Sequence, residues 1–367
     1  MKNGSRLAAL GGVVVAGALA LSACGSDNNT TASASGAPSG DIDCAKAGVN
    51  AAGSSAQKNA IEEWTKLYAS TCAGANLNYN PSGSGAGIQA FTSGQVAFAG
   101  SDSALKPEEA TAARKRCQGS SALNLPMVVG PVAVVYNLQG VDGLKLSPET
   151  LASVFSGKIK NWNDPAIAKE NAGAKLPGDP IKPIYRSDES GTTDNFTNYL
   201  HTTAPKIWTW EKAKKWPSST GQGAPKSDGV TSQVKSTAGS ISYVEMSYAE
   251  NNKLQTAHVK NGAGEFTALS PDSASKAVAG AKVAGTGNDV ALEIDYATKE
   301  PGAYPIVLVT YEIACEKGLP AEQAAFVKSF LTYTSSADGQ KILTGQGYAP
   351  LPPNVLTKVQ ASVKALS

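Results

Sequence analysis

Two long apolar segments constrain the fold of this chain most strongly. The segments PMVVGPVAVVYNL (126–138) and AYPIVLVTYEIA (303–314) are rich in β-branched residues, and each contains proline. Such residues favour extended chain, and runs this apolar have to be buried. Because the segments enclose the middle of the chain, we expect a discontinuous first domain, 41–130 plus 303–367, and a second domain, 131–302. The two segments would be crossover strands that form a hinge. Two separate sequential domains are the alternative.

Short apolar runs alternate with helical patterns elsewhere, which is typical of an α/β fold. Ile61, Trp64 and Tyr68 recur at helical spacing, and Ser54 or Ser55 stands where the N-cap of that helix is expected. About 327 residues follow residue 40, which is long for a single hydrophobic core. Length and pattern together predict two α/β domains.

The N-terminus has the pattern of an export signal. Two basic residues precede an uncharged apolar run that is short for a membrane span and ends in LSAC, 21–24. This tetrapeptide has the form of a lipobox, at which bacterial lipoproteins are cleaved and their new N-terminal cysteine is acylated. We therefore expect a signal peptide (1–23), lipidation of Cys24 and a flexible tether (24–40). An uncleaved membrane anchor is the alternative, and both place the protein outside the cytoplasm.

The charge balance argues against nucleic acid as a partner. The chain has 32 Lys+Arg and 30 Asp+Glu, and residues 1–23 hold two of the basic residues and none of the acidic ones. The mature chain is therefore neutral, whereas a nucleic-acid binder needs a basic face. An anionic ligand would have to be held by a local site.

Four cysteines remain beyond the lipobox, and their even number in an exported chain favours two disulfides. They are Cys44, Cys72, Cys117 and Cys315. Three pairings are available and the sequence does not choose among them; we prefer Cys44 with Cys72 and Cys117 with Cys315. A metal site is the alternative, but the chain has no CxxC motif.

Catalytic motifs are absent from the sequence. It contains no GxSxG, P-loop, GxGxxG or HExxH motif. Its two histidines, His201 and His258, lack metal-ligand spacing, and we expect both at the surface. We therefore expect neither catalysis nor a metal or cofactor.

Three turns rich in glycine and hydroxyl groups precede helical patterns. They are GSSA (53–56), SGSGAG (82–87) and SDESGT (187–192). The start of a helix leaves N–H groups free and carries partial positive charge, so each turn can hold an anion. Each alone is also an ordinary helix start. Three in one chain, with Arg186 just before the third, favour an anion site.

Asp102 follows an apolar strand-like run, at the strand end where α/β folds usually bind ligands. The alternative is that Asp102 caps a helix that begins near Pro107.

These four stretches carry a resemblance to a known family. GSSA, GSGAG, GSDSAL and RSDESGTT, in this order, resemble the extracytoplasmic phosphate-binding protein of the Pst phosphate ABC importer. STAGSISYVE (236–245) and YAPLPP (348–353) are similar to further landmarks of that family. The resemblance implies a type II periplasmic-binding-protein fold whose ligand cleft lies between the domains. It also implies a monomeric receptor that delivers phosphate to a membrane permease.

The resemblance further implies a set of ligand-binding residues. The phosphate ligands fall on Ser55, Ala56, Ser84, Asp102, Arg186, Ser190, Gly191 and Thr192. Asp188 matches the carboxylate that holds the arginine in place. Asp102 would discriminate against sulfate, because phosphate keeps a proton that a carboxylate can accept. The chain departs from the family at Ser55 and Ala56, where Thr and an aromatic residue are common.

Three other functions compete with this one. A receptor for sulfate or molybdate disagrees with Asp102. A secreted phosphoesterase would need an activated nucleophile, and Ser84 and Ser190 have no histidine near them in sequence. A surface adhesin with a vestigial site would have no affinity for phosphate.

Overall fold

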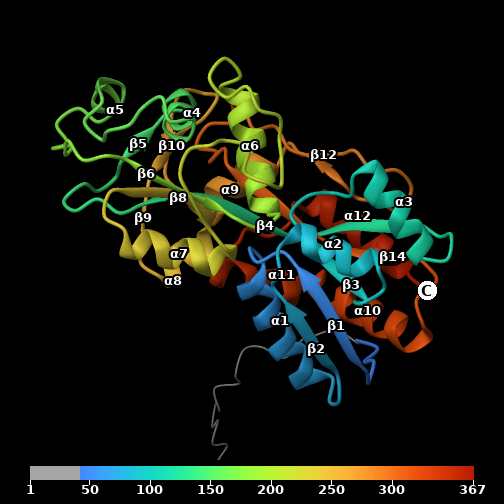
Figure 1. The fold of residues 1–367 in the computed structure, drawn as a ribbon. Helices are drawn as coiled ribbons and strands as arrows, with labels where there is room; N and C mark the ends of the chain where they lie inside the picture. The colour runs from blue at the N-terminus through green and yellow to red at the C-terminus, as the bar shows by residue number, and fades with distance from the viewer. Residues whose placement is uncertain (1–41) are drawn as a thin grey trace, which may run out of the picture. The chain divides into compact units, whose positions relative to one another are not determined.

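The computed structural model describes residues 42–367 (Figure 1). The predicted signal peptide, Cys24 and the tether up to residue 40 lie outside the described residues. Among residues 42–367, the structure contains no helix with the length and apolar character needed to cross a membrane.

Most strands belong to one nine-stranded sheet with the order β2-β1-β3-β14-β4-β8-β6-β7, and β9 pairs with β4. Its strands are β1 (Gly48–Gly53), β2 (Asn76–Asn80), β3 (Phe98–Ser101), β4 (Ala122–Tyr136), β6 (Lys182–Arg186), β7 (Gln222–Ala224), β8 (Ser240–Glu245), β9 (Gln255–Thr256) and β14 (Val307–Cys315). Two small sheets contain β5 (Lys145–Leu146), β10 (His258–Lys260) and β11 (Phe266–Thr267), and β12 (Lys282–Val283) and β13 (Leu292–Glu293).

Helices connect these strands, which confirms the predicted α/β class. They are α1 (Lys58–Thr71), α2 (Ser84–Thr92), α3 (Pro107–Arg116), α4 (Pro148–Phe155), α5 (Pro165–Glu170), α6 (Gly191–Thr203), α7 (Lys226–Ser236), α8 (Met246–Asn251), α9 (Pro271–Val278), α10 (Ala321–Thr334), α11 (Ala337–Gly345) and α12 (Pro353–Lys364).

The two apolar segments form adjacent antiparallel strands, β4 and β14, which lie side by side in Figure 1. The first part of β4 pairs with β14, from Ala122 opposite Cys315 onward. Its last part, Val132–Tyr136, pairs with β8. Both segments are therefore extended and buried, as predicted. Strand β4 pairs with β14 along its first part and with β8 along its last part.

The buried apolar residues form two large clusters and a smaller one. The first cluster combines α1, β1, β3, the first part of β4 and the C-terminal helices. The second combines the last part of β4 with α4, α6 and β8. The third lies between β4, β8 and the helices α7 and α8. Along β4, the apolar residues up to Val129 belong to the first cluster, whereas Val132 already belongs to the second.

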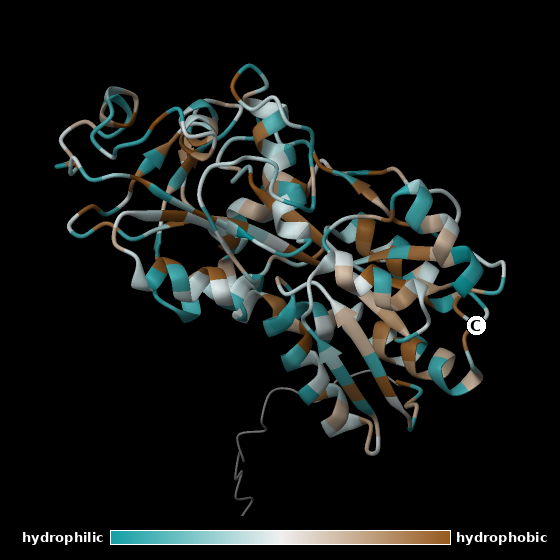
Figure 2. Ribbon diagram, in the orientation of Figure 1, coloured by the Kyte–Doolittle hydropathy of each residue, from teal (hydrophilic) through white to brown (hydrophobic). Residues whose placement is uncertain are grey.

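Helix α1 is amphipathic, and Figure 2 shows hydrophobic and hydrophilic residues along its turns. Its buried face includes Ile61, Trp64 and Tyr68, as the spacing predicted. The expected serine N-cap is wrong, because the residue before the first turn is Gln57. The Ser54 hydroxyl instead accepts a hydrogen bond from the Ala56 N–H (3.1 Å), which fixes the loop ahead of the helix.

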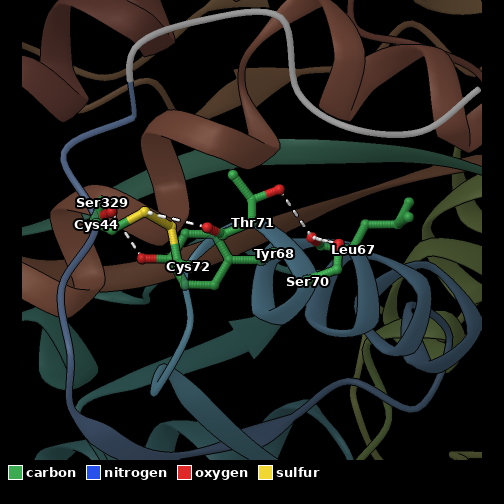
Figure 3. Close-up of a disulfide and its surroundings, with 7 residues drawn as sticks. All are labelled: Cys44, Leu67, Tyr68, Ser70, Thr71, Cys72 and Ser329. Carbon is green, nitrogen blue, oxygen red and sulfur yellow. Dashed lines mark hydrogen bonds between the residues drawn. A yellow bond between two sulfur atoms is a disulfide. The ribbon is translucent and has the colours of Figure 1, made fainter.

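Two disulfides are present, in the pairing that we preferred. Cys44 pairs with Cys72, which ties the chain before β1 to the end of α1. Figure 3 shows Tyr68 beside this bond, where its hydroxyl donates to Ser329 at 2.7 Å. Cys117 pairs with Cys315 and joins the end of α3 to the end of β14.

Candidate anion-binding site

Four helix starts come together at one place in the fold. The starts of α1, α2, α6 and α7 follow the carboxyl ends of β1, β2, β6 and β7, which run in parallel pairs. The Ser84 hydroxyl of α2 accepts from the Gly191 N–H of α6 at 3.2 Å. The Ser55 hydroxyl likewise accepts from the Ser227 N–H of α7 at 3.2 Å. Because each helix start carries partial positive charge, this convergence favours an anion.

Arg186, at the end of β6, is held by a two-pronged bond to Asp188. Its Nε donates to Oδ1 at 2.8 Å and its Nη2 to Oδ2 at 2.6 Å. Its Nη1 lies 3.5 Å from the hydroxyls of Thr192 and Ser227. The guanidinium is only 2% exposed. Asp188 therefore fixes the plane of the guanidinium, and Nη1 faces the starts of α6 and α7.

The charge of this pair also shifts the pKa of Asp188. Burial alone would raise it, but the hydrogen bonds and charge of Arg186 outweigh burial, so the pKa lies below its ordinary value. A backbone bond from the Lys226 N–H to Asp188 Oδ1 (2.9 Å) adds to this effect. Asp188 is thus held as a carboxylate.

Asp102 lies just beyond β3 and is 3% exposed. The Thr310 hydroxyl donates to its Oδ1 at 2.8 Å, and the Ser84 hydroxyl donates to its Oδ2 at 3.3 Å. Burial raises the pKa of Asp102, while neighbouring hydroxyls and the charge of Arg186 oppose that rise. The result is a buried carboxyl group beside the starts of α2 and α6.

The alternative role of Asp102 as a helix cap is wrong. Helix α3 begins after Lys106, whose N–H donates to the Glu109 side chain at 2.8 Å. Asp102 bonds Ser84 and Thr310 instead, because the chain turns inward directly after β3.

Glycine is required where the backbones approach one another. A Cβ added to Gly191 would lie 2.5 Å from the Ser84 hydroxyl and 2.6 Å from the Asp102 Cβ. A Cβ added to Gly83, which has φ of +100°, would lie 2.5 Å from Asp188 Oδ2. Neither position can carry a larger side chain without displacing a residue of the site.

The structure places the residues named from the sequence around this point. The Ser190 hydroxyl caps α6 by accepting from the Thr193 N–H at 3.2 Å. The Ala56 carbonyl accepts from the Tyr348 hydroxyl at 2.7 Å. The eight predicted ligand residues are buried, and Asp188 is half-buried: Ser55, Ala56, Ser84, Asp102, Arg186, Ser190, Gly191 and Thr192.

The two distant sequence landmarks also reach the site. Tyr243, from STAGSISYVE, accepts from the Arg186 N–H at 3.3 Å and shares a 2.8 Å bond with Thr193. Tyr348, from YAPLPP, supports the first loop through Ala56. Both tyrosines act on the backbone that carries the site.

Sequence reasoning missed Ser227 and Thr310. Ser227 belongs to KSDG, a stretch with a hydroxyl and a glycine in the first turn of α7, so a search for such residues at helix starts would have found it. Thr310 lies inside an apolar strand, and no local pattern distinguishes it.

The described residues offer little else that carries chemistry. Within residues 42–367, no group of three or more His, Cys, Asp or Glu side chains is arranged to hold a metal ion. His201 and His258 are half-buried, and the side chain of His201 is 35% exposed, so both reach the surface as predicted. His201 lies 3.8 Å from Glu211, away from the helix starts, and His258 belongs to β10.

A large hollow borders the site on one side. It has a volume of about 910 Å³ and is lined in part by Asp102, Asp194 and Tyr296. Its lining does not include Arg186 or Ser84. Of the eight predicted ligand residues the hollow reaches only Asp102, and it also borders the first turn of α6 at Asp194 and Asn195.

Comparison with known proteins places the chain among binding proteins. The family model described as a PBP superfamily domain matches residues 28–338. Phosphate-binding protein PstS 3 of Mycobacterium tuberculosis is 43% identical, and the match covers 99% of each chain. Phosphate-binding protein PstS of Pasteurella multocida is 35% identical over 86% of this chain and 90% of that protein.

A solved structure shares the fold. A high-affinity periplasmic phosphate-binding protein, PfluDING, bound with phosphate, matches with a TM-score of 0.71 and 23% identity. The match covers 86% of this chain and 93% of that one. The similarity supports the predicted type II periplasmic-binding-protein fold.

Proposed function

The chain belongs to the PstS phosphate-binding proteins of the PBP superfamily, and we propose that it binds inorganic phosphate outside the cytoplasm and delivers it to an ABC importer. One observation carries the proposal. A single hydroxyl, Ser84, joins the buried carboxyl of Asp102 to the start of α6, beside the fixed guanidinium of Arg186. This arrangement combines donors for an oxyanion with an acceptor for its proton.

The donors suit a dehydrated phosphate ion. Arg186 offers Nη1 in a plane already fixed by Asp188, so little side-chain entropy is lost on binding. The starts of α1, α2 and α6 offer oriented N–H groups and hydroxyls without a full countercharge for each oxygen. We assign the phosphate ligands to the eight residues that the sequence predicted.

Asp102 gives selectivity. Hydrogen phosphate can donate a hydrogen bond from its P–O–H group to this carboxylate, whereas sulfate has no proton to donate and leaves a buried acceptor position without its donor. Such a mismatch costs about 1–3 kcal/mol for a neutral group and more for a charged one. An anion pressed against a carboxylate adds repulsion, so sulfate is rejected.

We propose that the two predicted domains close on the ligand. The contacts of Ser84 with Gly191 and of Ser55 with Ser227 join residues of the first domain to residues of the second. The strands β4 and β14 would act as the hinge, since they are the strands that pass between the two large apolar clusters. Closure would then give the permease a distinct shape to recognise.

We further propose that Cys24 is lipidated after removal of residues 1–23. Its acyl chains would hold a monomeric receptor at the outer face of the cell membrane, next to its permease. The neutral mature chain fits this arrangement, because it has no strong electrostatic attraction of its own to an anionic membrane.

Calorimetric titration of the purified protein, freed of bound anion, tests the function. We expect tight binding of phosphate and no response to sulfate. In D102N the discriminating carboxylate becomes an amide that can donate, so phosphate should bind at least tenfold more weakly and sulfate should begin to bind. Absence of phosphate binding in the wild type would refute the proposal.

The same preparation separates the receptor from the phosphoesterase alternative. We propose that the protein is not an enzyme and expect no phosphate release from a chromogenic monoester. Steady turnover that disappears in an S84A variant would favour the phosphoesterase instead.

A further inference from the structure

Asn195 carries a buried amide next to the site that the proposed function does not use. It lies in α6, four residues after Gly191, with which the helix begins, and is 7% exposed. Its Nδ2 donates to the Asp102 carbonyl at 2.6 Å and to the Gly191 carbonyl at 2.8 Å. One side chain therefore bonds the backbone of two predicted phosphate ligands.

These bonds fix the direction in which the amide points. A carbonyl oxygen can only accept, so Asn195 has to present its nitrogen to both Asp102 and Gly191. Its Oδ1 then faces the hydroxyl of the buried Tyr296, 2.6 Å away, and that hydroxyl has to be the donor. Both N–H groups and the oxygen of the amide are used. A rotated amide would place its oxygen against two carbonyls, so Tyr296 and the carbonyls together hold one orientation.

A second contact joins the same two parts of the chain. The hydroxyl of Ser103, the residue after Asp102, donates to Asp194 Oδ2 at 2.8 Å. Two adjacent residues of α6, Asp194 and Asn195, thus hold two adjacent residues of the loop that follows β3. The loop belongs to the first predicted domain and α6 to the second. Helix α6 therefore fixes the Asp102 loop across the predicted domain boundary.

We propose that Asn195 is a positioning residue for the Asp102 carboxylate: it fixes the Asp102 backbone against the start of α6, and Tyr296 orients the amide that does so. The carboxyl group of Asp102 is itself bonded to Ser84, which accepts from the Gly191 N–H. With carbonyl and carboxyl both held, Asp102 loses little freedom when hydrogen phosphate donates to it. This role rests on the proposed phosphate function; the contacts themselves do not.

Calorimetric titration of N195A tests the role. The variant loses the donor to the Asp102 carbonyl, and we expect phosphate to bind roughly tenfold more weakly than to wild type. Asn195 lines the hollow beside the site, so the space left by the shorter side chain joins that hollow and the fold should survive. Y296F keeps the amide and removes the hydroxyl that orients it, so a smaller loss of about threefold is expected.

Asn171 provides a matched control away from the site. It is also buried, and its Nδ2 also donates to the carbonyl four residues earlier, that of Ile167, at 2.9 Å. Its Nδ2 and Oδ1 bond the Lys145 backbone of β5, each at 2.8 Å. N171A should therefore lose a similar amount of stability in urea unfolding and keep wild-type affinity for phosphate. An equal loss of affinity in N171A and N195A would overturn the positioning role, because general destabilisation would then explain both.

Urea unfolding of the phosphate-free protein tests the contact between Tyr296 and Asn195 by itself. If the hydroxyl acts through the amide, Y296F should destabilise wild type but add little to the loss that N195A already causes. Losses that simply add would contradict the orienting role of Tyr296.

A double-mutant cycle with D102N decides whether Asn195 acts through Asp102. Once the carboxylate is an amide, holding it in place contributes less, so N195A should weaken phosphate binding by less than about threefold in the D102N background. The same tenfold loss in both backgrounds would overturn the proposal. Wild-type affinity of N195A would refute the positioning role alone, whereas failure of wild type to bind phosphate would refute the proposed function and this role with it.

Discussion

At the scale of single residues, the candidate site is held together by hydroxyl groups that each contact two of its elements. Ser227 shows this most clearly, because its Oγ lies 2.8 Å from the Ser55 hydroxyl and 3.5 Å from Arg186 Nη1. Its N–H also donates to Ser55. It therefore connects the first loop, the start of α7 and the guanidinium.

We expect S227A to weaken phosphate binding by roughly tenfold, which corresponds to the loss of one hydrogen bond in a charged network. The matched control is S236A, at the exposed end of the same helix, whose hydroxyl bonds only the Gln233 carbonyl in the described structure. Calorimetric titration should show wild-type affinity for S236A. Wild-type affinity for S227A as well would remove Ser227 from the site.

At the scale of elements, the four helix starts have two functions in the proposed receptor, because each begins a helix and would also face the phosphate. The Ser190 N-cap separates these functions experimentally. Its hydroxyl accepts from the Thr193 N–H, so S190A should destabilise the protein by about 1 kcal/mol. It should also weaken phosphate binding, since the first turn of α6 loses its fixed orientation.

The control is Ser336, which caps α11 in the same way by accepting from the Gly339 N–H at 3.1 Å. S336A should lose a similar amount of stability in urea unfolding and keep its affinity for phosphate. If both variants lost affinity equally, the effect of S190A would reflect general destabilisation and not the site.

The accuracy of the sequence-based prediction differs between these elements for physical reasons. Local patterns revealed the glycine and hydroxyl turns and the apolar strands, because both follow from backbone conformation and burial. The start of α1 was misplaced, since a local bond to the Ser54 hydroxyl and a tertiary bond from Tyr79 hold the Ser54 loop in place of a helical turn. Thr310 could not be found, because the role of a polar residue in a buried strand depends on its neighbours across the sheet.

At the scale of the whole molecule, the proposed function requires the predicted domains to close until the backbone of one contacts side chains of the other. Gly191 lies at such a point, because Ser84 and Asp102 of the other predicted domain occupy the space that a Cβ on Gly191 would need. A methyl group there has no room, whereas one on Gly345, in α11, meets no atom within 4 Å. The two glycines therefore form a matched pair for testing closure.

We expect G191A to bind phosphate roughly tenfold to hundredfold more weakly, because overpacking of this kind costs about 1–3 kcal/mol. Small-angle scattering should show a decrease in the radius of gyration of wild type and G345A when phosphate is added, and a smaller decrease or none in G191A. Since an isolated defect at one helix start would weaken binding without preventing compaction, the two measurements together separate a local effect from a block to closure. Full compaction of G191A would show that the contact between Ser84 and Gly191 does not limit closure.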